Sequence, residues 1–162
     1  MFIGPVYQLN NGNAGTTVST AITVTQLKPG TNGPVEILRA SITQSGNTTS
    51  SQVAAALQRK SAAATVTTAV AGTNLNKMNP VAPTSDASLG TSATGFTASA
   101  EGTPTDYAIK RGFNILNGFE WLPTPEERVI VPQSGFLGLT FVTAPPSATY
   151  YAETVFRELR GG

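Results

Sequence analysis

The stretch from Asn117 to Pro132, NGFEWLPTPEERVIVP, contains the only tryptophan of the chain and its densest group of charges. Pro123 and Pro125 fix two backbone φ angles and remove two backbone hydrogen-bond donors. The β-branched run after them favours a strand. This pattern predicts a rigid, polar corner between two strands, with a large aromatic anchor at one end. We interpret it as a possible interface, because a rigid exposed corner suits recognition better than catalysis. Its residues are Trp121, Leu122, Pro123, Pro125, Glu126, Glu127 and Arg128.

Much of the remaining chain alternates between apolar and more polar residues with a period of two, which is typical of β-strands. Turns rich in Gly, Pro and Asn separate these segments. The alternating positions are Val18, Thr20, Ile22 and Val24; Leu38, Ala40 and Ile42; Leu137, Leu139 and Phe141; and Tyr151, Val155 and Leu159. Many short strands punctuated in this way predict an all-β fold, an antiparallel β-sandwich or jelly roll.

Residues 50–60 give two conflicting signals. They contain good helix formers behind a serine that could cap a helix, so local propensity favours a helix. Their apolar residues Val53, Ala55 and Leu57 nevertheless alternate, and the segment lies between two strand-like segments. We therefore predict a strand.

We assign a single domain to residues 16–162 and predict that two segments extend from its compact core. Residues 72–105 are polar and lack periodicity, which predicts a long loop that is functional or held by a partner. Residues 1–15 are interpreted as an N-terminal arm, ordered by neighbouring subunits rather than by the core of its own chain. The residues that give the arm apolar contacts are Phe2, Ile3, Val6 and Tyr7.

The composition excludes several kinds of chemistry. The chain has no His and no Cys, which removes His-dependent nucleophilic triads, thiolate chemistry and metal sites with nitrogen or sulfur ligands. Glu120, Glu126 and Glu127 could form a carboxylate pair or a calcium site, but acids spaced across a proline corner are far more often solvated or paired with Arg128. We predict no enzyme activity, no catalytic residue, no metal and no cofactor.

The charge pattern indicates protein partners. The net charge is +1, and only 12% of residues are charged. Basic residues occur at most in pairs, too sparse to track a phosphate backbone, so we expect no nucleic acid. No apolar stretch is long enough to span a bilayer and the start lacks the basic residues of a signal peptide, so we expect cytoplasmic synthesis and no membrane. A charge-poor, nearly neutral surface favours association, and we expect a homo-oligomer.

A resemblance extends this interpretation. The segments DYAIKRGFNILN (106–117), WLPTPEERVIV (121–131) and SGFLGL (134–139) resemble a group of small structural proteins of tailed bacteriophages. Their hallmark is a strand ending in Trp, a Leu-Pro-x-Pro-Glu-Glu-Arg corner, a β-branched strand and a Ser-Gly turn. The likeness covers about a third of the chain well. The Ala-rich residues 53–64 depart from the charged strand expected there.

The resemblance implies a head decoration, or cement, protein with a jelly-roll fold. Such a subunit would bind the major capsid protein on the outside of the head and reside in the virion. We expect a trimer rather than a dimer, since three-fold positions are abundant on icosahedral lattices. The alternative is a tail-fibre or head-fibre module that binds host carbohydrate through Trp121, Tyr107 and Glu120. Burial of Trp121 in the core would argue against that alternative.

Overall fold

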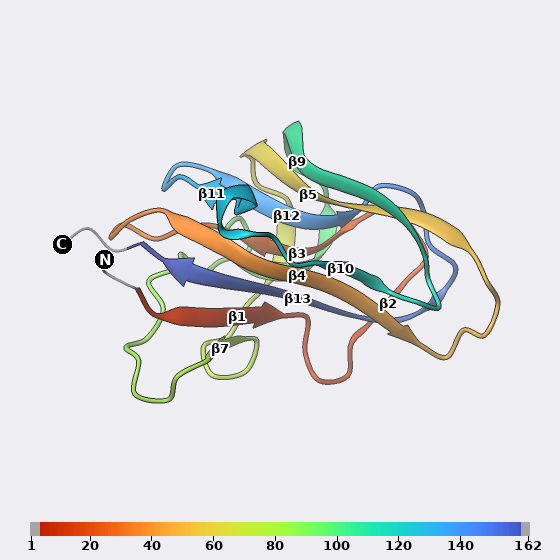
Figure 1. Cartoon of the computed structure of the whole chain (residues 1–162), viewed down its shortest axis with the longest axis horizontal. Coiled ribbons are helices and arrows are strands. Elements are labelled where there is room, and N and C mark those ends of the chain that lie inside the picture. Colours follow the sequence, from red (N-terminus) through yellow and green to blue (C-terminus); the bar gives the residue numbers. More distant parts are fainter. Residues whose placement is uncertain (1–3, 160–162) are drawn as a thin grey trace.

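The computed structural model describes residues 4–159, which form two antiparallel β-sheets packed face to face (Figure 1). The first sheet has the order β10–β4–β13–β1–β7, with β11 also beside β4 and β2 beside β13. Its strands are β1 (Val6–Asn10), β2 (Thr16–Val18), β4 (Val35–Ser45), β7 (Leu75–Lys77), β10 (Phe119–Trp121), β11 (Ile130–Val131) and β13 (Ala148–Glu158). The predicted β-sandwich is therefore confirmed, whereas the jelly-roll connectivity stays a prediction.

The second sheet has the order β6–β8–β3–β12–β5–β9. Its strands are β3 (Thr23–Leu27), β5 (Gln52–Ala62), β6 (Thr65–Thr68), β8 (Gly95–Ala100), β9 (Thr103–Asn114) and β12 (Phe136–Phe141). The only helical element among the described residues is the 3₁₀ turn η1 (Pro125–Glu127). Hence none of the described segments includes a helix that could cross a membrane.

The core lies between the sheets. Phe141 of β12 meets Tyr150 of β13 edge to face, with 4.9 Å between ring centroids. A hydrogen bond of 3.1 Å also joins the hydroxyl groups of Thr25 in β3 and Thr154 in β13. The strand predicted at residues 137–141 is confirmed as β12, and Leu137, Leu139 and Phe141 are all buried, as is Thr140 between them.

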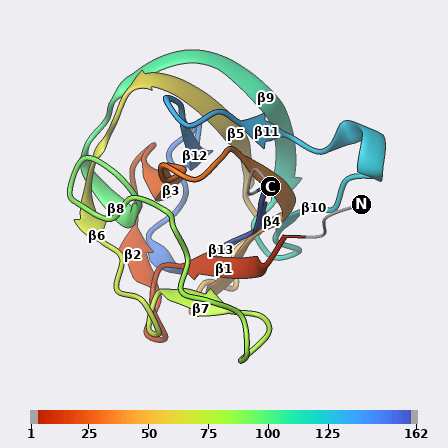
Figure 2. The same cartoon turned by 90° about the vertical axis from the view of Figure 1, so that its left-hand side faces the viewer.

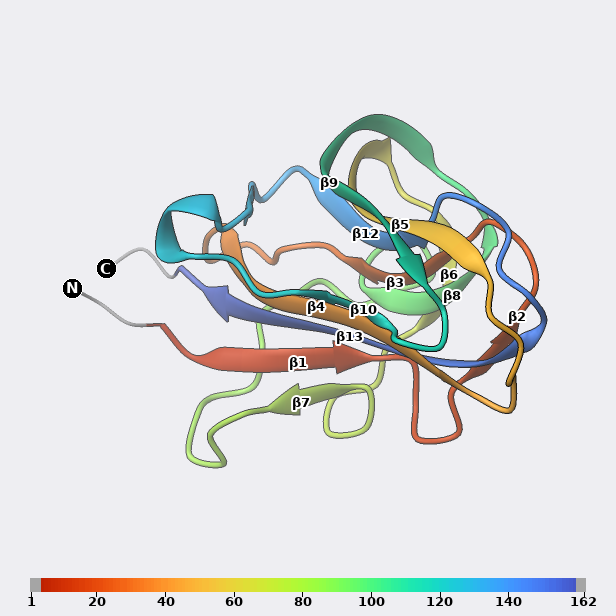
Figure 3. The same cartoon turned by 45° about the vertical axis from the view of Figure 1, so that its right-hand side comes forward.

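The N-terminal arm prediction is wrong for the part of the arm that the structure describes. β1 pairs with β13 on one side and with β7 on the other (Figure 3). The side chains of Tyr7 and Leu9 are fully buried, and Val6 is half-buried. The core of this chain therefore orders β1 without a neighbouring subunit. Phe2 and Ile3 lie outside the described residues.

A β-bulge changes which residues of β4 face the core. Alternation predicts Leu38, Ala40 and Ile42 on the inner face, but Ile37 is fully buried while Leu38 is half-buried. The register between β4 and β13 shifts next to Leu38, where the chain accommodates one extra residue. A one-residue shift moves every later side chain to the opposite face, so Leu38 leaves the inner row.

β13 is a strand as predicted, but its inner face is not the expected row. Tyr150, Ala152 and Phe156 are buried; of the expected row, Val155 is buried as well, whereas Tyr151 is 37% exposed. Both faces of β13 carry large side chains, so the alternation in the sequence does not show which face is buried. The second sheet decides which row is covered, because β12 and β3 pack on the row that holds Tyr150 and Thr154.

The strand predicted at residues 50–60 is confirmed from Gln52 onward, as part of β5. β5 pairs with β12 through residues 55–60 on one side and with β9 along most of its length on the other. A position between two strands satisfies backbone groups on both edges, which explains how helix-favouring alanines are held in an extended conformation.

The long polar loop predicted at residues 72–105 is wrong in part. β7, β8 and the first residues of β9 lie within it, and β8 pairs with both β3 and β6. Residues 78–94 carry no named strand. Few side chains of β8 are fully buried, so its sequence lacks the apolar alternation that reveals a strand.

Candidate interaction surfaces

The proline corner is an excursion from one edge of β4. β10 pairs Trp121 with Ala40, and β11 pairs Ile130 with Glu36. The chain leaves the sheet edge after Trp121, passes through η1 and returns at Ile130. Figure 2 shows this corner projecting from the body of the sandwich, between β10 and β11.

The corner is anchored inside and exposed outside. Trp121 is 2% exposed, and Pro123 and Val129 are also buried. Leu122, in contrast, is 73% exposed. The prediction that Trp121 anchors the core is confirmed. A buried indole cannot serve as the sugar platform of the carbohydrate hypothesis, so the role proposed there for Trp121 is wrong.

Local interactions hold the corner in shape. Pro125 begins η1 at a position where the missing N–H costs nothing. The Glu127 N–H donates to the Thr124 carbonyl at 3.0 Å, and the Thr124 N–H donates to the Glu127 carboxylate at 3.4 Å. Pro125, Glu126 and Glu127 are exposed. The corner therefore presents two carboxylates and an apolar side chain on a short, fixed turn.

Arg128 contacts a different carboxylate from the one the sequence suggests. Its guanidinium lies 3.5 Å from Glu36 of β4, and Arg157 of β13 lies 3.2 Å from the other oxygen of Glu36. Arg128 thus pairs with neither Glu126 nor Glu127, and both of these are exposed. Glu120 is exposed on β10. Across residues 4–159, no group of three acidic residues is arranged to hold a metal ion.

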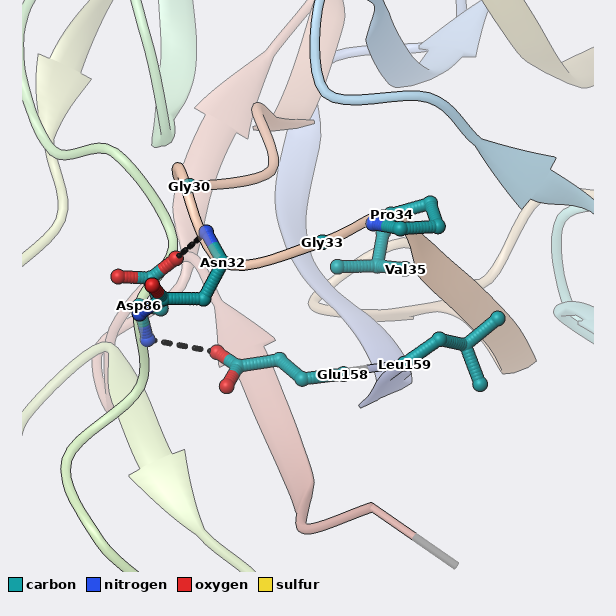
Figure 4. A pocket seen from close by; sticks show the side chains of 8 residues that line it. All are labelled: Gly30, Asn32, Gly33, Pro34, Val35, Asp86, Glu158 and Leu159. Carbon is teal, nitrogen blue, oxygen red and sulfur yellow. Dashed lines mark hydrogen bonds between the residues drawn. The ribbon is translucent and has the colours of Figure 1, made fainter. Parts of the chain in front are cut away.

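A small crevice shows how residues 78–94 attach to the sandwich (Figure 4). The Asn32 N–H donates to the Asp86 carboxylate at 2.8 Å, and the Asp86 N–H donates to the Glu158 carboxylate at 2.7 Å. A Cβ on Gly30 would lie 1.8 Å from the Asp86 carbonyl oxygen, so only glycine permits this approach. The crevice has no room for a water molecule. It is a structural contact that holds the loop on its own chain.

A buried ion pair lies on the second sheet, and the sequence gives no sign of it. The Lys60 ammonium is fully buried and donates to the Glu101 carboxylate at 2.8 Å and to the Thr23 hydroxyl at 2.6 Å. Glu101 also accepts from the Thr23 N–H at 2.6 Å. Burial raises the pKa of Glu101, but the hydrogen bonds from Lys60 and Thr23 outweigh it, so the net pKa is below its usual value. Lys60 and Glu101 are both engaged in holding strands together.

An open polar pocket lies on the first sheet beside the turn after β1. Its volume is about 470 Å³. Tyr151 and Glu153 of β13 and Ser41 of β4 line it together with the asparagines of the turn. Glu153 is already bonded to Gln8 and Arg39. The pocket offers an exposed aromatic ring, amides and hydroxyl groups. The carbohydrate hypothesis expected a binding site of this chemistry at Trp121, Tyr107 and Glu120 instead.

Tyr107, the other aromatic of the carbohydrate hypothesis, does not join this pocket. It lies on β9 and is 45% exposed. The Lys110 ammonium covers its ring at 4.9 Å from the centroid. The structure therefore does not bring Trp121, Tyr107 and Glu120 together into one site.

No known family, curated protein or solved structure matches the chain.

Proposed function

We propose that the protein is a structural virion protein, a decoration or cement subunit that binds the outside of a tailed-phage head. In this role it contacts the major capsid protein and stabilises contacts between neighbouring capsid subunits. It needs no cofactor and catalyses no reaction, in keeping with a sequence without His or Cys. The proposal rests on the resemblance of residues 106–139 and on the form that those residues take.

One observation carries the proposal: the residues with the most specific resemblance build the projecting corner. Leu122 is 73% exposed and Ile130 is 44% exposed, while Trp121 beneath them is 2% exposed. A rigid segment loses little conformational entropy on binding, so the contacts it makes are retained as affinity. The complementary surface on a capsid protein is an apolar socket flanked by basic side chains that meet Glu126 and Glu127.

A decoration protein acts through many copies. Several weak corner contacts on one shell add up through high effective concentration. The corner therefore need not be large to stabilise a head.

Co-sedimentation with empty heads of the parent phage tests the corner. Leu122→Asp should weaken binding at least tenfold, because a central apolar contact contributes on the order of 2 kcal/mol or more. Leu116→Asp is the matched control, since Leu116 is also exposed, at 46%, but lies in the turn between β9 and β10. Equal binding of wild type and Leu122→Asp would contradict the role of the corner.

The location of the protein in purified particles tests the wider proposal. Antibody labelling seen by electron microscopy should mark the head surface. Labelling confined to the tail would contradict the decoration role and favour a fibre.

The pocket beside Tyr151 favours a second candidate function, a fibre module that binds host carbohydrate. An exposed aromatic next to amides and a carboxylate can stack on and hydrogen-bond to a sugar. A glycan array should then give a hit that Tyr151→Ala removes, while Tyr107→Ala leaves it unchanged. An array without binding would contradict this function.

A further inference from the structure

The outermost strand of the second sheet, β9, has a long edge that no other strand of residues 4–159 pairs with. It pairs with β5 on one side only (Figure 2). The opposite edge strand of that sheet, β6, is 4 residues long, whereas β9 is 12 residues long. Unpaired edges of this length invite pairing with another strand unless they carry protective features.

A proline and register shifts occur only in the first half of β9, whereas the second half carries the charged residues Lys110 and Arg111. Pro104 lies in the first half, and the register with β5 shifts repeatedly between residues 103 and 109. From Ile109 to Asn114 the register is regular and contains no proline. A proline and β-bulges prevent further pairing, so the second half is the part left able to pair.

The hydrogen bonds show which residues of β9 face the open edge. The Ile115 N–H donates to the Ser51 carbonyl at 3.0 Å. In an antiparallel pair, residues that bond to the neighbouring strand alternate with residues that face away. Lys110, Gly112 and Asn114 therefore turn their backbone groups to the open edge.

Ala54, which lies opposite Gly112, independently supports the assignment of Gly112 to the open edge. Its carbonyl accepts from the Val142 N–H at 2.8 Å and its N–H donates to the Thr143 hydroxyl at 2.8 Å. Ala54 thus bonds away from β9. Among the described residues, no strand pairs with the outward-facing backbone of Gly112.

We propose that β9 pairs with β9 of a second copy of this chain, antiparallel and centred on Gly112. In this register Gly112 faces Gly112, and Lys110 faces Asn114 of the second copy. Each of these facing pairs exchanges two backbone hydrogen bonds. The result is one continuous sheet across a two-fold axis, a self-complementary interface.

Charge selects this register over its neighbours. A centre on Lys110 or Arg111 would place like charges directly opposite, which is destabilising. A centre on Gly112 instead places Arg111 opposite Phe113 of the second copy, where the guanidinium can lie against the ring. A centre on Phe113 is also free of like charges, but it leaves fewer facing pairs because β9 ends at Asn114.

The net charge of +1 adds little repulsion between copies. The paired segment is short, so we expect a reversible dimer. This association concerns the free protein and does not rest on the capsid role. It replaces the expected trimer with a two-fold assembly.

Single-cysteine variants test the register sharply, because the chain has no cysteine of its own. Facing Cα atoms would lie about 5.5 Å apart, within the range that a disulfide spans. A side chain is tolerated at Gly112, since a Cβ there would meet only the Val53 carbonyl at 3.8 Å. Gly112→Cys should therefore form a covalent dimer under mild oxidation.

The matched controls are Lys110→Cys and Asn114→Cys. Each would lie four residues, or about 14 Å, from its own counterpart, too far for a disulfide. Neither should cross-link alone, but a mixture of the two should give a covalent heterodimer. Equal cross-linking of all three variants would indicate random collision and overturn the proposal. Cross-linking of Lys110→Cys alone, or the absence of any cross-link, would also overturn it.

Sedimentation equilibrium tests the same pairing without cysteines. Gly112→Pro removes the central donor while sparing every bond to β5, and edge strands accept proline where the N–H faces solvent. It should raise the dissociation constant at least tenfold, whereas Gly112→Ala should leave it nearly unchanged, with circular dichroism confirming the fold of both. A wild type that stays monomeric at every concentration would overturn the proposal. Capsid binding by the proline variant reports on the decoration role separately.

Discussion

Replacing Trp121 by alanine is expected to destabilise the protein strongly. The side chain is 2% exposed and lies at the end of β10, where the corner joins the core. A tryptophan buries roughly 150–250 Å², which corresponds to about 4–6 kcal/mol at about 25 cal/mol per Å². That area is an upper bound, because the unfolded chain already covers part of it. We therefore expect Trp121→Ala to cost about 3–5 kcal/mol, the range found for buried aromatics replaced by alanine.

The assay is urea unfolding followed by far-ultraviolet circular dichroism, since the variant loses the only tryptophan. For a domain of this size the loss corresponds to a fall in Tm of about 6–20 °C. Leu122→Ala is the control: the next residue is 73% exposed, and its truncation should change stability by less than about 0.5 kcal/mol. A cost below about 1 kcal/mol for Trp121→Ala would refute its role as the anchor of the corner.

Three further predictions concern the Lys60–Glu101 ion pair and the N-terminal strand. Glu101→Gln should lower the free energy of unfolding by about 2–3 kcal/mol, because it leaves the fully buried Lys60 without its carboxylate partner. Lys60→Met should lower it clearly less, because Glu101 is 40% exposed and can be hydrated. Equal losses in urea titrations would contradict this. The lowered pKa of Glu101 contributes stability above the ordinary carboxyl pKa that is lost as the pH falls through the lowered value, so acid should destabilise the wild type more steeply than Glu101→Gln; parallel stability–pH curves would contradict that linkage. Deleting residues 1–10 should abolish cooperative unfolding, because Tyr7 and Leu9 fill the core; an unchanged Tm would instead support the arm interpretation.

The sequence by itself determined the class of fold and the nature of the corner. Alternation of apolar residues is a local property, so it identified β12 and β5 as strands, the latter against its helix propensity. Proline chemistry is also local, so the rigid turn and the inward Trp121 were predictable.

Only the tertiary structure decided which strands are neighbours and which side chains they cover. β1 becomes an inner strand because β13 from the end of the chain and β7 from its middle pair with it. Lys60 and Glu101 meet across a long stretch of sequence, and no local pattern marks a lysine that will be fully buried. Leu38 leaves the core because of a bulge that depends on the register with β13. The same holds for the open edge of β9, since a strand is an edge only by virtue of where its sheet ends. In an antiparallel sandwich most pairings join distant residues, so these features depend on the assembled sheets rather than on any segment alone.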